Sequence, residues 1–210
     1  MPVQLYNREE ILETCLAEFA KNGYEKTSLV QLARAAGISR TLIFHHFKSK
    51  KLLYLEIIDH IVEQAGVDGV FGLLAQNPDF FKAREEFSRY KFCFIKNNPL
   101  YYRIMKEIVS DPPAELGDEL KARFGELQAR YQKKWQELFD KVPLRDGVDR
   151  NQAYEFVQMT LDYFDEKYYP TSAADKDLDD AYFQQFLEER NRFLEMLRYG
   201  IQERSEVENG

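Results

Sequence analysis

Apolar residues recur at helical spacing through most of this chain, and no segment alternates apolar and polar residues as a half-buried strand would. The first stripe occupies positions i, i+1, i+4, i+5, i+8 and i+9, which are Ile11, Leu12, Cys15, Leu16, Phe19 and Ala20. Asn7 before this stripe is a good N-cap, and Gly23 after it can end the helix. The pattern predicts an all-α fold of about nine helices.

Capping residues, glycines and prolines divide the rest of the chain into further helices. Ser28, Ser39 and Ser49 are predicted N-caps. The helices are predicted at about 28–36, 39–47, 49 to beyond 62, 80–95, 100–109, 114–141, 151–168 and 179–203. Gly66, Gly69 and Gly72 lie in or just beyond the fourth helix, where they indicate close packing against a neighbour or, as the less favoured interpretation, a soft hinge.

Charge is unevenly distributed along the chain. The net charge of −7 and the pI near 5.2 disfavour nonspecific nucleic-acid binding over the whole surface. Residues 1–51, however, hold eight lysines and arginines against five glutamates, so this end carries +3 and the remaining residues carry −10. A small basic segment therefore precedes an acidic body.

The second and third predicted helices, joined at Gly37, fit a helix-turn-helix unit. Ile38, Ile43 and Phe47 are expected to anchor this unit to the first helix. The outer side of the third helix then carries Arg40, Thr41, Leu42, Phe44, His45 and His46. A helix that enters the major groove needs hydrogen-bond donors and methyl-contacting groups near its N-terminus, where Arg40 and Thr41 lie.

Three lysines surround the start of the fourth helix. Lys48 precedes the N-cap Ser49, and Lys50 and Lys51 follow it, where a cation is unfavourable against the helix dipole. Backbone amides and lysine charge together make a good anion site, and a DNA phosphate is the obvious anion. The alternative is that these lysines are ordinary solvated surface charge.

Adjacent histidines do not indicate a metal site in this chain. His45 and His46 point about 100° apart on a helix. His60, the third histidine, has no cysteine or carboxylate at ligand spacing in the sequence. The sequence therefore predicts no metal, and His45 and His46 fit better as base-edge or phosphate contacts.

Residues 7–58, above all TSLVQLARAAGISRTLIFHHFKSKKLL at 27–53, resemble the N-terminal domain of the tetracycline-repressor (TetR) family. The glycine turn, the aromatic-His-His-Phe segment and Lys-Ser-Lys fall in that family's order and spacing. The rest of the chain matches in its helical plan and length. The resemblance implies a homodimeric, ligand-responsive transcription factor, usually a repressor.

Carried over position by position, the resemblance implies that Arg40, Thr41 and His45 face bases. It assigns backbone contacts to Ser28, Phe44, His46 and Lys50, and the charge argument adds Lys48 and Lys51. Phe44 replaces the usual tyrosine, so a hydroxyl-to-phosphate bond is lost. Thr41 and Leu42 replace a common pair of small residues, which predicts an unusual operator sequence.

The resemblance also implies a domain plan. Residues 1–50 would be the helix-turn-helix DNA-binding domain, 51–203 the helical effector-binding and dimerisation domain, and 204–210 a frayed tail. The last two helices would form the homodimer interface, so that two recognition helices read a near-palindromic double-stranded operator. A small, largely apolar effector would release the DNA.

The effector pocket is expected among aromatic and methionine residues of the body. The candidates are Tyr90, Phe94, Tyr101, Tyr102, Met105, Tyr131, Trp135, Met159 and Tyr163. Aromatic residues at helical spacing equally fit a packed core, and the sequence does not separate lining from filling.

Other classes of function have little support in the sequence. It contains no nucleophile–base pair, phosphate loop or metal cluster, so we expect neither an enzyme nor a bound cofactor. No window is apolar enough to span a membrane and the N-terminus has no signal-peptide pattern, so a cytoplasmic protein is expected. Cys15 and Cys93 are expected to be small buried thiols, with a disulfide or redox pair as the alternative. A DNA-binding protein of the same fold, architectural or partner-regulated and without an effector, is the alternative function.

Overall fold

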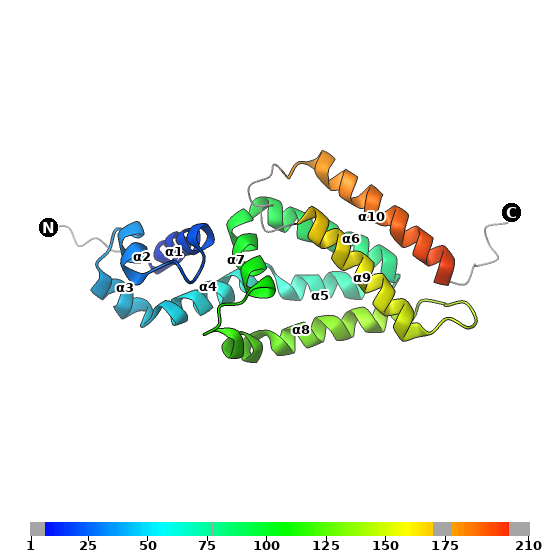
Figure 1. Cartoon of the computed structure of the whole chain (residues 1–210), viewed down its shortest axis with the longest axis horizontal. Coiled ribbons are helices and arrows are strands. Elements are labelled where there is room, and N and C mark those ends of the chain that lie inside the picture. Colours follow the sequence, from blue (N-terminus) through cyan, green and yellow to red (C-terminus); the bar gives the residue numbers. More distant parts are fainter. Residues whose placement is uncertain (1–6, 77, 170–177, 202–210) are drawn as a thin grey trace. The chain divides into compact units, whose positions relative to one another are not determined.

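The computed structural model describes residues 7–76, 78–169 and 178–201, which form ten α-helices and contain no strand (Figure 1). The helices are α1 (Arg8–Asn22), α2 (Leu29–Ala35), α3 (Arg40–Phe47), α4 (Lys50–Gln64), α5 (Val67–Gln76), α6 (Phe80–Asn97), α7 (Pro99–Ser110), α8 (Gly117–Phe139), α9 (Arg150–Tyr168) and α10 (Asp180–Ile201). The all-α class is confirmed. The additional helix arises because the chain breaks between α4 and α5 at Gly66, which has φ of 58°. The predicted tail at 204–210 lies outside the described residues.

The chain divides into two compact units, each built from two segments. Unit 1 comprises residues 1–67 and 97–125, and so combines α1 to α4 with α7 and the beginning of α8. Unit 2 comprises residues 68–96 and 126–210, with α5, α6, the rest of α8, α9 and α10. The boundary expected after residue 50 is a division by function and stays a prediction.

The local sequence signals for the first four helices are confirmed. The side chains of Asn7, Ser28, Ser39 and Ser49 each accept a hydrogen bond from a backbone N–H two or three residues further on. Ser28 and Gln31 complete a capping box. Gly23 and Gly37 have φ of 76° and 65°, a region that glycine enters without steric cost.

The core of unit 1 holds the helix-turn-helix on α1. Ile38, Ile43 and Phe47 are 9%, 0% and 3% exposed, as the sequence predicted. In the same core, Phe19 of α1 packs edge-on against Tyr54 of α4, with ring centroids 4.9 Å apart. The Tyr24 ring also packs edge-on against Tyr54, with ring centroids 4.8 Å apart. Helix α7 packs against both α1 and α4, so a helix from far along the chain also supports the unit.

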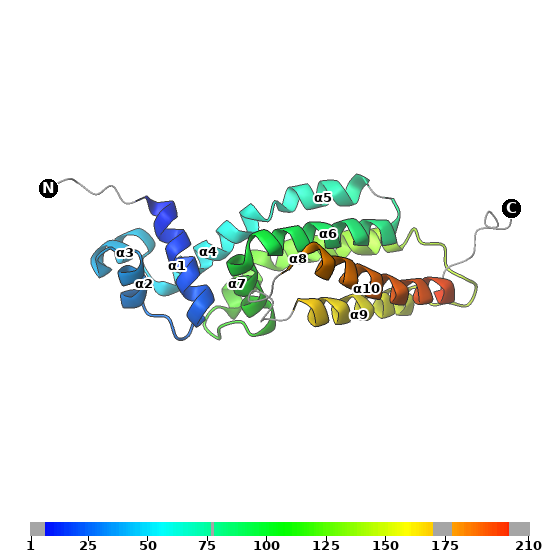
Figure 2. The same ribbon diagram turned by 90° about the horizontal axis from the view of Figure 1, so that it is seen from above.

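Unit 2 is a helical bundle with an aromatic centre. Phe80 of α6 contacts Trp135 and Phe139 of α8 edge-on, and this cluster continues into α9 through Ala153 and Val157 and into α10 through Leu194. Helices α9 and α10 lie side by side, as Figures 1 and 2 both show. Burial of this apolar surface is the main stabilising contribution to the unit.

Two sequence-based interpretations are wrong. A Cβ atom added at Gly69 or Gly72 would meet no described atom within 4 Å, so close packing does not explain these glycines. Cys15 is fully buried as expected, but Cys93 on α6 is exposed, and both thiols are free.

Candidate nucleic-acid interface

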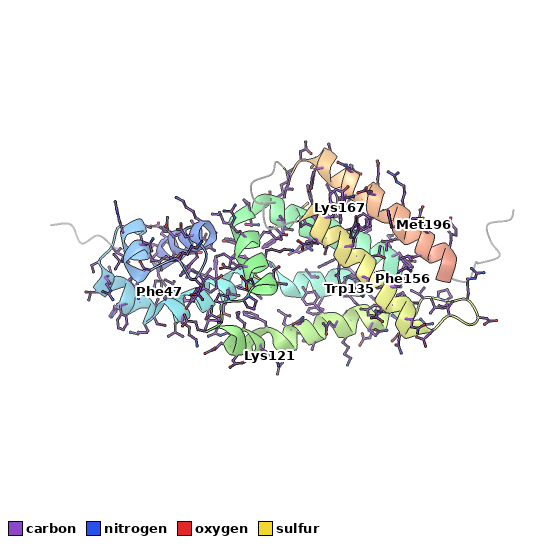
Figure 3. The ribbon with its side chains drawn as sticks, in the orientation of Figure 1. Phe47, Lys121, Trp135, Phe156, Lys167 and Met196 are labelled. Carbon is purple, nitrogen blue, oxygen red and sulfur yellow. The ribbon has the colours of Figure 1, made fainter. Side chains whose placement is uncertain are left out.

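Helix α3 presents two adjacent rows of side chains to solvent. Arg40 and Phe44 are four residues apart, as are Thr41 and His45, so each pair lies on one face of the helix. All four residues are exposed, and Phe44 is 56% exposed. The opposite face is fixed in the core by Ile43 and by Phe47, which is labelled in Figure 3. One face of α3 is therefore fixed in the core, and the opposite face is exposed to solvent.

The polar groups on this open face are available for a ligand. The side chains of Arg40 and Thr41 form no hydrogen bond or ion pair within residues 7–76, 78–169 and 178–201. The ring of His45 contacts the edge of the His46 ring at 5.6 Å between centroids. Ser39 caps the Leu42 N–H, so the N-terminal turn that carries Arg40 and Thr41 is well ordered. A guanidinium there has the bidentate donor geometry that suits guanine O6 and N7.

The turn between α3 and α4 is strained at Lys48. This residue has φ of 63° and ψ of −42°, and the Ser49 N–H donates to the Phe47 carbonyl at 2.7 Å across it. These values describe a γ-turn with positive φ, which is rare for a residue with a Cβ. The Lys48 ammonium donates to the His45 carbonyl at 3.0 Å and the side chain remains exposed. The turn thus places one cation directly beside the end of α3.

Three of the other expected backbone contacts, Ser28, Lys50 and Lys51, are already engaged inside unit 1. Lys50 donates to the Tyr24 carbonyl at 3.1 Å and its ammonium lies 4.0 Å from the centre of the Tyr24 ring. Lys51 forms an ion pair with Glu119 of α8. Ser28 is exposed, but its hydroxyl is part of the capping box. An ammonium keeps other donors, so these residues can still face a phosphate, with less freedom than the sequence suggested.

Sequence reasoning missed Glu107 of α7. Its Oε1 accepts from the Tyr24 backbone N–H at 3.0 Å, and its Oε2 accepts from the Tyr54 hydroxyl at 2.9 Å. The Tyr24 hydroxyl donates to Glu115. Burial, and then the nearby carboxylate, raises the pKa of Tyr54 and of Tyr24 above the ordinary tyrosine value. A contact 83 residues apart in sequence has no local signal.

A second missed cluster joins α1, α4 and α7. The His60 Nε2 lies 2.9 Å from Glu13 Oε1, and the Tyr101 hydroxyl donates to the same oxygen at 2.5 Å. The carboxylate that His60 lacks in the sequence therefore comes from another helix. In the part of the chain that the structure describes, no group of three histidine, cysteine or carboxylate side chains could hold a metal ion.

Comparison with known proteins concerns this same region. Residues 11–57 match the family model for bacterial regulatory proteins of the tetR family. The match covers α1 from Ile11 onward, the helix-turn-helix and the first half of α4, including every exposed residue of α3. Residues 11–57 are therefore similar to the DNA-binding domain of TetR-family regulators.

Two named regulators and one solved structure are also similar to this chain. The chain is 44% identical over 50 residues to the HTH-type transcriptional regulator AcrR of Shigella flexneri, which covers 24% of this chain and 23% of AcrR. It is 30% identical over 128 residues to the HTH-type transcriptional regulator RutR of Escherichia coli strain K12, covering 58% of each chain. The matched segments thus span less than two thirds of the relatives' own lengths. The fold also matches the fatty acid degradation regulator FadR of Bacillus halodurans, with a TM-score of 0.63, 16% identity and coverage of 90% of this chain and 98% of that one.

The nine expected effector-pocket residues are divided between the two units, and their role as a pocket stays a prediction. Tyr101, Tyr102 and Met105 are on α7 in unit 1, where Tyr101 binds Glu13. In unit 2, Tyr90 of α6 and Tyr131 of α8 pack against the cluster that contains Trp135, and Phe94 is half-buried on α6. Met159 and Tyr163 are 62% and 57% exposed on the outer face of α9. Three of the nine residues are therefore in unit 1. The other six are in unit 2, some in or against its core and some at its surface.

Helices α9 and α10 share an exposed apolar face. It is defined by Phe156, Met159 and Tyr163 on α9 and by Phe193, Met196 and Tyr199 on α10, each between 46% and 62% exposed. Five of these residues, with Thr160 and Leu197, line an open groove of about 490 Å³, and Figure 3 labels Phe156 and Met196 on its two helices. Contiguous exposed apolar surface of this kind marks an interaction site.

A membrane-spanning role has no support from the helices. Within the described ranges, none is both long and apolar enough to cross a bilayer.

Proposed function

We propose that this chain is a ligand-responsive transcriptional repressor that binds a near-palindromic operator as a homodimer. The observation that carries the proposal is the open face of α3 in a domain similar to that of TetR-family regulators, where Arg40, Thr41 and His45 are exposed and the first two are unengaged within the described residues. Related regulators share this domain, and none of the relatives compared above is an enzyme. A cytoplasmic location is part of the proposal.

The proposed mode of DNA reading follows from the two rows of α3. Arg40 and Thr41 would donate to or contact base edges from the first turn, and His45 would contact a base one turn later. Phe44 and His46 would contact the sugar–phosphate backbone, with Ser28, Lys48, Lys50 and Lys51 supplying phosphate contacts. Such contacts position the helix, whereas the base contacts select the sequence.

Dimerisation is proposed through the apolar face of α9 and α10. One eight-residue helix buries too little DNA surface for tight specific binding, so a second copy is needed. A twofold interface also requires a self-complementary patch, which an exposed apolar face on two adjacent helices can supply. Two copies of α3 would then read successive major grooves about 34–36 Å apart.

Release by a small effector is proposed for unit 2. FadR of Bacillus subtilis, a structural neighbour at 15% identity, has been solved in complex with stearoyl-CoA. The second candidate is a regulator without a small effector. It is favoured by the observation that the grooves described in unit 2 are open to the surface rather than enclosed.

The proposal is tested by titrating the purified protein with duplex DNA from upstream of its own and neighbouring genes. We expect a protected, near-palindromic footprint and a binding constant that falls steeply as salt rises. Arg40→Ala should cost about 1–3 kcal/mol of binding free energy and change the sequence preference. Arg89→Ala removes the same charge from α6 in unit 2, so it should leave the sequence preference intact. Equal affinity for upstream and random duplex at every salt concentration would refute the proposal.

A further inference from the structure

Unit 2 contains a fully buried arginine with no acidic partner. Arg190 of α10 is 1% exposed. Its guanidinium donates to the Ser88 hydroxyl of α6 and to Asn191 Oδ1, and lies 5.0 Å from the centre of the Phe186 ring. All these partners are neutral. Moving an arginine out of water costs several kcal/mol unless an anion pairs with it.

The Asn191 amide occupies the place that a carboxylate normally takes. Its Oδ1 accepts from both Nε and Nη2 of Arg190, at 3.3 and 3.0 Å. Donation from two adjacent guanidinium nitrogens is the fork geometry with which arginine binds a carboxylate or a phosphate. The neutral Asn191 amide therefore lies where a carboxylate or phosphate would bind the guanidinium, but it supplies no negative charge.

A second arginine stands nearby with an unused donor. The guanidinium of Arg84 on α6 stacks 3.7 Å from the centre of the Trp135 ring, and its Nε is buried with no hydrogen-bond partner. Gln158 Nε2 of α9 is also buried and without one. Burial lowers the pKa of Arg84 to about 10. Tyr154, Asp165 and Asp162 oppose this shift, whereas the charge of Arg190 adds to it, so the two cations are close enough to repel. At neutral pH both remain charged.

Two neighbouring carboxylates pair with other cations, and a third is exposed to solvent. Asp165 of α9 pairs with Lys91 at 2.7 Å, and Glu85 faces Arg89 at 3.9 Å. Asp162 is exposed; partial desolvation of its carboxylate, followed by repulsion from Asp165, raises its pKa, and the charges of Arg84 and Lys91 act in the opposite direction. Within the described part of the chain, no carboxylate forms an ion pair with Arg84 or Arg190. The bundle thus holds two cations and two unused donors. Asp165 acts on both cations through its charge, Asp162 acts on Arg84 and Glu85 on Arg190, but within the described residues none of these carboxylates forms an ion pair with either arginine.

We propose that unit 2 binds an amphipathic organic anion, whose carboxylate or phosphate group pairs with Arg84 and Arg190. The inference rests on the proposed ligand response and adds a negative charge to an effector expected to be largely apolar. A groove of about 340 Å³ between α6 and α10 has apolar, amide and charged lining residues, namely Phe81, Leu194, Asn191, Lys82, Arg198, Asp79, Glu85 and Glu195. Displacement of the Asn191 amide would give the anion a route from this groove to Arg190, past charges of both signs. The unused donors of Arg84 and Gln158 would complete its hydrogen bonds.

The test uses the full chain with three probes of equal chain length: octanoate, monooctyl phosphate and 1-octanol. Trp135, the one tryptophan of the chain, lies under Arg84, so its fluorescence reports on binding directly, and thermal melting provides a second readout. We expect at least one anion to bind at least tenfold more tightly than the alcohol and to raise the melting temperature. Comparison of the two anions identifies the preferred head group. Equal binding of all three probes, or no binding, overturns the proposal.

Matched variants separate this role from a structural one. Arg190→Met and Arg84→Met should each lose at least tenfold in affinity for the anion and leave 1-octanol unchanged. Without probes, Arg190→Met should melt at the same or a higher temperature, because an unpaired buried cation has been removed. Arg192→Met, an exposed arginine on the same helix, should behave as wild type. An anion preference that persists in both Arg84 and Arg190 variants contradicts the proposal.

These readouts do not involve DNA, so the two proposals can fail separately. Specific operator binding without any preference for anions removes only the inference about the effector. Anion binding that depends on Arg190 but leaves DNA binding untouched keeps the site and refutes the ligand response.

Discussion

The Glu107 carboxylate of α7 accepts a 3.0 Å hydrogen bond from the backbone N–H of Tyr24, the residue that follows the glycine at the end of α1. A Cβ atom at Gly23 would lie 3.3 Å from the same carboxylate oxygen, so the glycine allows this close approach. Lys50 binds the Tyr24 carbonyl. The turn that leads into the helix-turn-helix is therefore held by α7 and by the start of α4.

Removing this carboxylate should destabilise the protein. Glu107→Ala leaves the Tyr24 N–H and the fully buried Tyr54 side chain without their acceptor, so we expect a loss of about 1–3 kcal/mol in the free energy of unfolding. Urea denaturation measures the change. Glu126→Ala, at an exposed position of α8, should shift the midpoint by little. A midpoint for Glu107→Ala equal to that of the control would show that this contact contributes nothing.

Relief of the strained turn should have the opposite effect. Lys48→Gly allows positive φ without a Cβ clash and should raise the free energy of unfolding by about 1 kcal/mol. Lys48→Ala removes the same charge but keeps the strain, so it should not be stabilised. If both variants weaken operator binding equally while differing in stability, the cation and the strain act independently. Equal stability of the two variants would argue against strain at this residue.

The proposed dimer can be broken by charge on the apolar face. Met159→Glu combined with Met196→Glu places like charges on both helices of the face, and we expect a monomer of about 25 kDa by sedimentation equilibrium. Asn151→Glu with Gln184→Glu adds the same charge at exposed positions of α9 and α10 away from the apolar face, and should leave the dimer intact. A double methionine variant that remains dimeric would locate the interface elsewhere.

The two thiols should react at very different rates. Cys93 is exposed, whereas Cys15 is fully buried and burial raises its pKa to about 12, which removes the reactive thiolate at neutral pH. An aromatic disulfide reagent at pH 8 should therefore modify one thiol quickly and the second only on unfolding. Cys93→Ser should abolish the fast phase. Rapid modification of two thiols in the folded protein would contradict the burial of Cys15.

Alkaline pH should destabilise the fold. The pKa of Cys15 is raised from 9.0 to about 12, so between these values the unfolded chain releases a proton that the folded chain keeps. Its contribution is complete below pH 9 and declines above it. The raised pKa of Tyr54 and of Tyr101 acts in the same direction at higher pH. Urea midpoints should fall from pH 9 to pH 11, and less steeply in Cys15→Ala.

Local features of the sequence were sufficient for the DNA-facing part of the fold. Ser28, Ser39 and Gly37 define helix ends through interactions within four residues, and the burial of Ile43 follows from its spacing in α3. The break at Gly66 was less clear, because glycine both weakens a helix and ends one.

Contacts between helices far apart in the chain could not be predicted from the sequence. Whether Lys50 points to solvent or to Tyr24 depends on a turn 26 residues earlier, and the acidic partner of His60 lies on another helix. Met159 and Trp135 are similar in spacing and apolar character, yet one is 62% exposed and the other 5%. Only the identity of the neighbouring helices separates them. The same limit concealed Arg190, which reads as a surface residue in sequence.

Unit 1 is assembled from two stretches of chain, and this sets an order of events during synthesis. Until residues 97–125 have left the ribosome, α1 and α4 lack the helix that covers them, and the turn at Tyr24 lacks its acceptor. A protein truncated soon after α4 would therefore lack part of the core of unit 1, and we do not expect it to fold as an independent DNA-binding domain. Anyone who exchanges this DNA-reading end with that of a relative must transplant both pieces together.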